Sequence, residues 1–207
     1  MKKLSIALVM ALFVATFFLP VSASAADIYK SKGTGAEAFF SSIDPSGCIV
    51  TDVNVYARDE KFQNPPGPGV PSSWVYLYVF QYDFCNDVQL FYGEGFTYLT
   101  DTDFVASNRL DRASLETTVS VYSYTTDSYV DVYVDLSWAG SGGISRQNSH
   151  FHSHVPGCNI NSRFKGSFRS AEASGSISDG STNFTPEPSW YANIFSVSSS
   201  DVFARCD

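Results

Sequence analysis

Hydrophobic and polar residues alternate with a period of two along most of the chain. In residues 49–57 the odd positions are Ile, Thr, Val, Val and Ala, and the even positions are Val, Asp, Asn and Tyr. In residues 129–138 the even positions are Val, Val, Val, Leu and Trp, and the odd positions are Tyr, Asp, Tyr, Asp and Ser. Successive side chains of a strand point to opposite faces, so this pattern predicts strands with one buried and one solvated face.

A weaker version of the same pattern occurs in residues 115–124, shorter ones occur in residues 88–92 and 190–197, and no segment sustains a helical period. Residues 36–42 could form one helical turn or a first strand. Loops rich in Pro, Gly and Ser separate the strands, as in NPPGPGVPSS at residues 64–73. This order of strands and turns predicts an all-β fold, an antiparallel β-sandwich or jelly-roll-like arrangement of two sheets held by disulfides.

Residues 74–84 read WVYLYVFQYDF, and every even position is aromatic. We expect the aliphatic residues Val75, Leu77 and Val79 to pack inward, which leaves a row of rings on the opposite face. Three interpretations are open. The strand is buried on both faces, or the rings form an exposed platform for sugars or apolar partners, or the strand rotates midway. The platform interpretation selects these candidate ligand-binding residues: Trp74, Tyr76, Tyr78, Tyr82, Tyr129 and Tyr133.

The first residues have the pattern of a bacterial secretory signal peptide. Lys2 and Lys3 precede an apolar run at residues 4–19, and Ala23-Ser24-Ala25 is a small-residue cleavage motif. We therefore expect a signal peptide over residues 1–25, a single all-β domain over residues 26–207, and a secreted, extracellular protein that does not span the membrane.

Four cysteines, an even number, suggest two disulfides in an oxidising compartment. If residues 49–57 and 74–84 pair antiparallel with Ala57 near Val75, Cys48 lies opposite Phe84 and next to Cys85. The sequence therefore predicts a Cys48–Cys85 bridge and, by elimination, a Cys158–Cys206 bridge.

The three histidines of the chain, His150, His152 and His154, are spaced by two and would share one strand face. Histidine pairs with this spacing can hold zinc, the one cofactor that the sequence suggests. In an extended strand the outer two lie roughly 13 Å apart, so one ion would take two neighbours unless the chain bends. The alternative is a polar strand that faces solvent.

The formal net charge of −8 argues against nucleic acid as a partner, because phosphate binding needs a basic face. No nucleophile motif or phosphate-binding loop is present, and no catalytic residue is assigned. We expect a non-catalytic protein that binds carbohydrate or a cell-envelope surface through its aromatic face. The alternatives are a metal-dependent hydrolase that uses the histidines and a structural component of an extracellular matrix or coat. The sequence specifies neither the ligand nor the oligomeric state.

Overall fold

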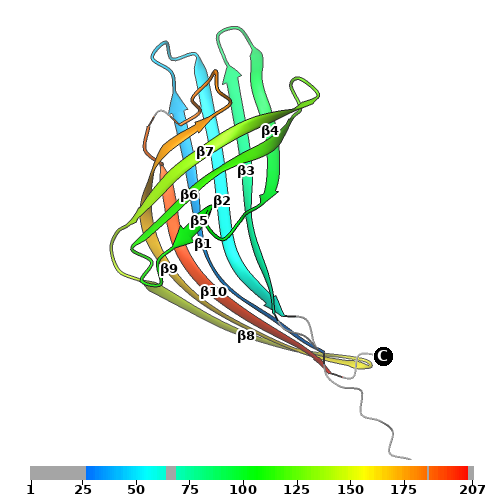
Figure 1. Ribbon diagram of the computed structural model, residues 1–207. Helices are drawn as coiled ribbons and strands as arrows, with labels where there is room; N and C mark the ends of the chain where they lie inside the picture. Colours follow the sequence, from blue (N-terminus) through cyan, green and yellow to red (C-terminus); the bar gives the residue numbers. More distant parts are fainter. Residues whose placement is uncertain (1–26, 64–68, 186, 205–207) are drawn as a thin grey trace, which may run out of the picture.

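The structure is a computed structural model that describes residues 27–63, 69–185 and 187–204, so the predicted signal peptide lies outside the described residues. The described chain consists of ten strands joined by turns and loops (Figure 1). Their bounds are β1 (Asp27–Ile43), β2 (Ile49–Gln63), β3 (Val70–Asp83), β4 (Val88–Tyr98), β5 (Phe104–Ala106), β6 (Arg112–Ser123), β7 (Ser128–Gly140), β8 (Ser145–Val155), β9 (Cys158–Ser178) and β10 (Tyr191–Ala204). In this described part, no helix is long and apolar enough to cross a membrane.

All ten strands belong to one antiparallel sheet. Nine follow the order β10-β1-β2-β3-β4-β6-β7-β9-β8, and the short strand β5 pairs with β6 beside this path. Because β10 pairs with β9 as well as with β1, the sheet closes on itself, and β8 continues it beyond β9. The predicted all-β, antiparallel fold is confirmed, but the expected division into two sheets is not. The alternation predicts two distinct faces for each strand, but it does not predict whether the sheet stays open or closes.

The side chains that face the inside of the closed sheet form the hydrophobic core. Val75, Leu77 and Val79 are fully buried, as the sequence predicts, and they pair with Ala57, Val55 and Val53 of β2. Trp138 of β7 lies in the same interior, and its indole N–H donates a 3.0 Å hydrogen bond to the Glu37 carbonyl of β1. This bond joins two strands that are far apart in the sequence.

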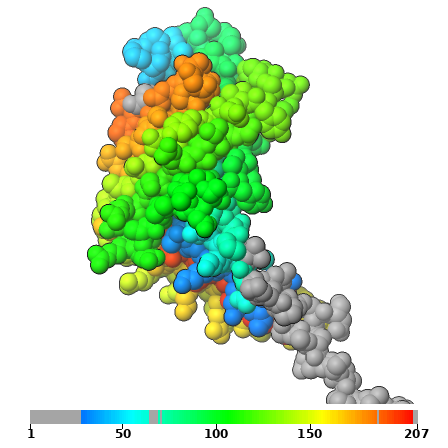
Figure 2. Space-filling model, viewed as in Figure 1, coloured from blue at the N-terminus to red at the C-terminus, as the bar shows by residue number. Residues whose placement is uncertain are grey.

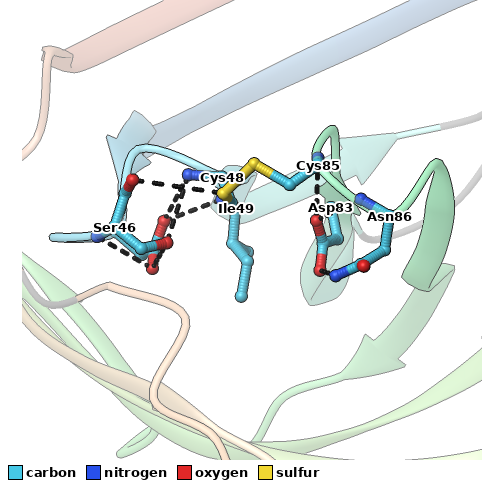
Figure 3. Close-up of a disulfide and its surroundings, with 7 residues drawn as sticks. Ser46, Cys48, Ile49, Asp83, Cys85 and Asn86 are labelled. Atoms are coloured by element: carbon cyan, nitrogen blue, oxygen red, sulfur yellow. Dashed lines mark hydrogen bonds between the residues drawn. A yellow bond between two sulfur atoms is a disulfide. The ribbon is translucent and has the colours of Figure 1, made fainter.

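The register of the β2–β3 hairpin agrees with the sequence prediction. Ala57 pairs with Val75, and the Phe84 N–H donates to the Cys48 carbonyl at 2.9 Å. The predicted Cys48–Cys85 disulfide is present, with a Cα–Cα distance of 5.3 Å, and it ties together the turns that flank the hairpin (Figure 3). Cys158 is also disulfide-bonded, but Cys206 lies outside the described residues, so its pairing with Cys158 stays a prediction.

Several strands run on past the closed part of the sheet. β1, β8, β9 and β10 continue together toward the lower right of Figure 1. β9, with 21 residues, pairs with β8 along its first half and with β7 along its second half. We call the part of the sheet alongside the β8–β9 pairing, together with the adjoining ends of β1, β2 and β10, the extension.

Candidate binding groove on the outer face

Aromatic rings form a layer on the outer face of the closed sheet. Trp74 of β3 lies between Tyr56 of β2 and Phe96 of β4, with ring centroids 5.3 and 5.5 Å away. Tyr56 also contacts Phe195 of β10 at 5.4 Å, and Phe195 is only 3% exposed although it lies outside the core. The outer face of these strands therefore carries an apolar layer of its own.

A second run of ring contacts continues this layer from β3 through β4 to β6 and β7. Tyr92 of β4 contacts Tyr78 at 5.9 Å and stacks on Tyr124 at 4.8 Å. Tyr122 lies 5.2 Å from Tyr124 and 5.3 Å from Tyr129. Because β6 and β7 cross in front of the other strands in Figures 1 and 2, both views look onto the outer face of these two strands.

A shallow groove of about 680 Å³ lies in this aromatic layer, where β4 meets β6. The two strands pair at Gly93–Ser123, Glu94–Tyr122 and Gly95–Val121, and just beyond β6 the Tyr124 N–H donates to the Tyr92 carbonyl at 2.8 Å. Gly95 permits this approach, because a Cβ atom there would lie 2.7 Å from the Ser120 carbonyl oxygen. The groove is lined by Tyr76, Glu94, Gly95, Phe96, Ser120, Tyr122, Tyr124 and Tyr129.

Glu94 supplies the one charged group among the described residues of this lining. Its two carboxylate oxygens accept hydrogen bonds from the hydroxyls of Tyr76, at 2.7 Å, and Tyr124, at 2.8 Å. These two bonds lower the pKa of Glu94 below its usual value. Burial, followed by the bond to Glu94, raises the pKa of Tyr76 to about 12. A carboxylate offers about four acceptor positions, so about two remain for a ligand.

The turn at the end of each neighbouring hairpin orients a further tyrosine. Tyr122 donates its hydroxyl to Asp127, and Tyr82 donates its hydroxyl to Asp87. Both aspartates have a positive φ, 52° at Asp127 and 55° at Asp87, in the left-handed region that Asp tolerates better than most residues. The hydrogen bonds to these carboxylates raise the pKa of both phenols. Tyr122 is thus held in place at the wall of the groove.

The structure brings together two of the six tyrosine and tryptophan residues selected from the sequence. Tyr76 and Tyr129 line the groove, and Tyr129 is 73% exposed. Trp74, Tyr78 and Tyr82 lie on the same outer face of β3 but do not line the groove. Tyr133 lies farther along β7, where its hydroxyl donates to Glu116 at 2.8 Å.

The sequence reasoning missed Glu94, Phe96, Ser120, Tyr122 and Tyr124. The alternation in residues 88–98 points to two of them. Glu94 and Phe96 occupy alternate positions with Tyr92 and Tyr98, so all four share one strand face. Pairing this strand with residues 74–83 places Phe96 opposite Tyr76 and Glu94 opposite Tyr78. Glu94 is recognised as part of an aromatic site only once this register is known.

The three histidines lie on β8 and are exposed. Nε2 of His150 donates to the Asn161 amide oxygen at 2.9 Å, and His154 is hydrogen-bonded to Asn159. Among the described residues, the only three potential metal-ligand atoms found close together belong to Cys48, Asp83 and Cys85, and the two cysteines form the disulfide. Zinc binding by His150, His152 or His154 stays a hypothesis.

Comparisons with known proteins found no relative of this chain. No protein-family model, no curated protein and no solved structure matches the chain.

Proposed function

We propose that the protein binds carbohydrate in the groove between β4 and β6. The observation that carries this proposal is the pairing of exposed rings with one ionised, oriented carboxylate. The C–H groups on one face of a sugar ring pack against the flat face of an aromatic side chain, and the hydroxyls at its edge need acceptors. Tyr129 and Phe96, which is 49% exposed, supply the ring faces, and Glu94 supplies the acceptors.

The groove has the size and composition of a ligand site. Its volume of about 680 Å³ falls within the usual range of about 300–1,000 Å³. Its hydroxyl groups are already oriented, because Tyr76 and Tyr124 are fixed on Glu94. Little side-chain freedom would be lost on binding, which favours affinity. The groove is open and shallow, which suits a chain of sugars lying along the surface.

The Cys48–Cys85 disulfide supports an extracellular site of action, because disulfides persist in oxidising compartments.

Isothermal titration with neutral hexasaccharides of glucose, xylose, mannose and N-acetylglucosamine tests the proposal. We expect at least one to bind, and Tyr129→Ala to weaken that binding about tenfold, at the lower end of the roughly 1–3 kcal/mol that one aromatic ring contributes when it stacks on a nucleic-acid base. Glu94→Gln keeps the side-chain shape and removes the charge, so it should also weaken binding.

Trp190→Ala is the matched control, because Trp190 is an exposed ring, at 79%, that does not line the groove. Binding that is lost equally in the Trp190 and Tyr129 variants would contradict the proposal, and so would the absence of binding to every neutral sugar.

A further inference from the structure

The inner face of the sheet changes from apolar to basic where the strands enter the extension. Ala36 of β1 and Ile194 of β10 are paired core residues, fully buried. Two residues farther along the same face, Thr34 pairs with Ser196, and two residues beyond these, Lys32 pairs with Ser198. Residues two apart in a strand share a face, so the surface that forms the core continues outward as a polar surface.

Three adjacent rows of paired residues cross this surface. The first row is Asp59, Thr34, Ser196, Ser167 and Arg146, the second is Lys61, Lys32, Ser198, Lys165 and Asn148, and the third is Gln63, Lys30, Ser200, Arg163 and His150. Each row runs through β2, β1, β10, β9 and β8 in that order. The rows hold six lysine or arginine residues and a single acid, Asp59. We call this surface the basic face.

A pocket of about 240 Å³ lies within the basic face and is formed by the extension alone. Lys32, Arg146 and Lys165 enter it from three different strands, and the hydroxyl-bearing residues Ser167, Ser196 and Ser198 lie between them. None of the described residues that line it is acidic. Cationic groups and hydroxyl donors around one space form a site for an anionic group.

The charges of the basic face are not neutralised within the described chain. The only ion pair among the described residues joins Arg58 to Glu60, at 2.9 Å. Lys32 and Lys61 even lie directly opposite each other on neighbouring strands. All six basic side chains are exposed. This concentration of positive charge occurs in a protein whose formal net charge is −8.

We propose that the basic face binds an acidic polysaccharide. The basic groups are spread over three rows about 7 Å apart and over strands about 4.8 Å apart, so they match a chain with several charges better than one small ion. The rows contain no Phe, Tyr or Trp on which nucleic-acid bases could stack. Their serine, threonine and asparagine side chains can instead bond to the hydroxyls of a sugar chain. This site is separate from the groove on the outer face and does not depend on it.

Binding of the mature full-length chain to polygalacturonate, to neutral dextran and to single-stranded poly-dT, in 50 mM and 500 mM NaCl, tests the proposal. We expect binding to polygalacturonate alone, and its loss in the higher salt, because salt screens exposed charges. Lys32→Gln, Arg146→Gln and Lys165→Gln should each weaken binding about fivefold, the effect of one contact charge pair in water. The triple variant should lose more than tenfold.

Arg112→Gln is the matched control, because it removes one exposed positive charge outside the basic face. Polygalacturonate binding that survives in the triple variant would overturn the proposal. Tighter binding of poly-dT would overturn it in favour of nucleic acid, and full competition by millimolar inorganic phosphate would overturn it in favour of a small anion. Tyr129→Ala should leave polygalacturonate binding unchanged, so failure of the groove proposal and failure of this one are separately visible.

Discussion

Replacing Gly35 by alanine tests whether the outer aromatic layer is packed as tightly as the structure indicates. Gly35 of β1 pairs with Phe195, whose ring lies across the place where a Cβ atom would be. That Cβ would lie 2.3 Å from Cζ of Phe195 and 2.7 Å from the backbone oxygen of Ala57. Ordinary contact begins at 3.4 Å, so the tip of the ring must move by about 1 Å and the Ala57 backbone must also give by about 0.7 Å.

The surroundings of Phe195 resist this movement, because Tyr56 and Phe168 lie 5.4 and 6.2 Å from its ring. Overpacking of this kind costs about 1–3 kcal/mol, and the stiffer unfolded chain returns about 0.4–1 kcal/mol. We therefore expect Gly35→Ala to lower the free energy of unfolding by about 1–2 kcal/mol, measured by urea denaturation.

Gly143→Ala is the control for this substitution, because a Cβ at Gly143 would meet nothing within 4 Å. It should leave stability within about 0.5 kcal/mol of the original, as surface substitutions usually do. Combining Gly35→Ala with Phe195→Leu should cost less than the sum of the two separate changes, since the shorter side chain makes room for the methyl group. Equal stability of the Gly35 and Gly143 variants would refute the assigned position of Phe195.

Two further predictions concern the hairpin and the groove. Replacing Cys48 and Cys85 by serine removes a disulfide that links residues 37 positions apart. Loop-closure entropy then predicts that the free energy of unfolding, measured in urea, falls by about 4 kcal/mol. A loss below about 1 kcal/mol would contradict this. The pKa of Tyr76 is raised from 10.0 to about 12, so the unfolded chain gives up this proton first as the pH rises. Stability should therefore fall between pH 10 and 12, and Tyr76→Phe should make that fall shallower; an unchanged slope in urea titrations would contradict the assignment.

The strands with one aliphatic face were predictable from the sequence, whereas the inner face of the extension was not. Residues 74–84 satisfied the alternation rule, and their inward aliphatic residues and their pairing with residues 49–57 are confirmed. In residues 158–168 the rule is reversed, because Phe164 and Phe168 lie on the outer face while Lys165 lies on the inner one. Alternation identifies two faces but not which of them is inside.

The closure of the sheet was also beyond the sequence pattern. It depends on the pairing of β10 with both β1 and β9, and the first of these joins Asp27 to Phe203 across nearly the whole chain. Tyr76 and Tyr129 were found because each lies in a strongly alternating strand, whereas Glu94 acquires its role from one hydroxyl on β3 and one in the turn after β6. A carboxylate of this kind cannot be told from a solvated one until the strand neighbours are known.

The distribution of charge on the inner face argues that the extension is more than a structural support. Like charges placed directly opposite each other on neighbouring strands destabilise a sheet, and Lys32 and Lys61 have this arrangement. Serine or threonine would extend the strands without that repulsion, as Thr34, Ser196 and Ser198 do on the same face. A chain with an excess of acidic residues also has many side chains that could neutralise these lysines, yet Asp59 is the single acid in the three rows. An anionic ligand would remove the repulsion and add attraction, so the basic face is suited to binding where a purely structural surface would not be.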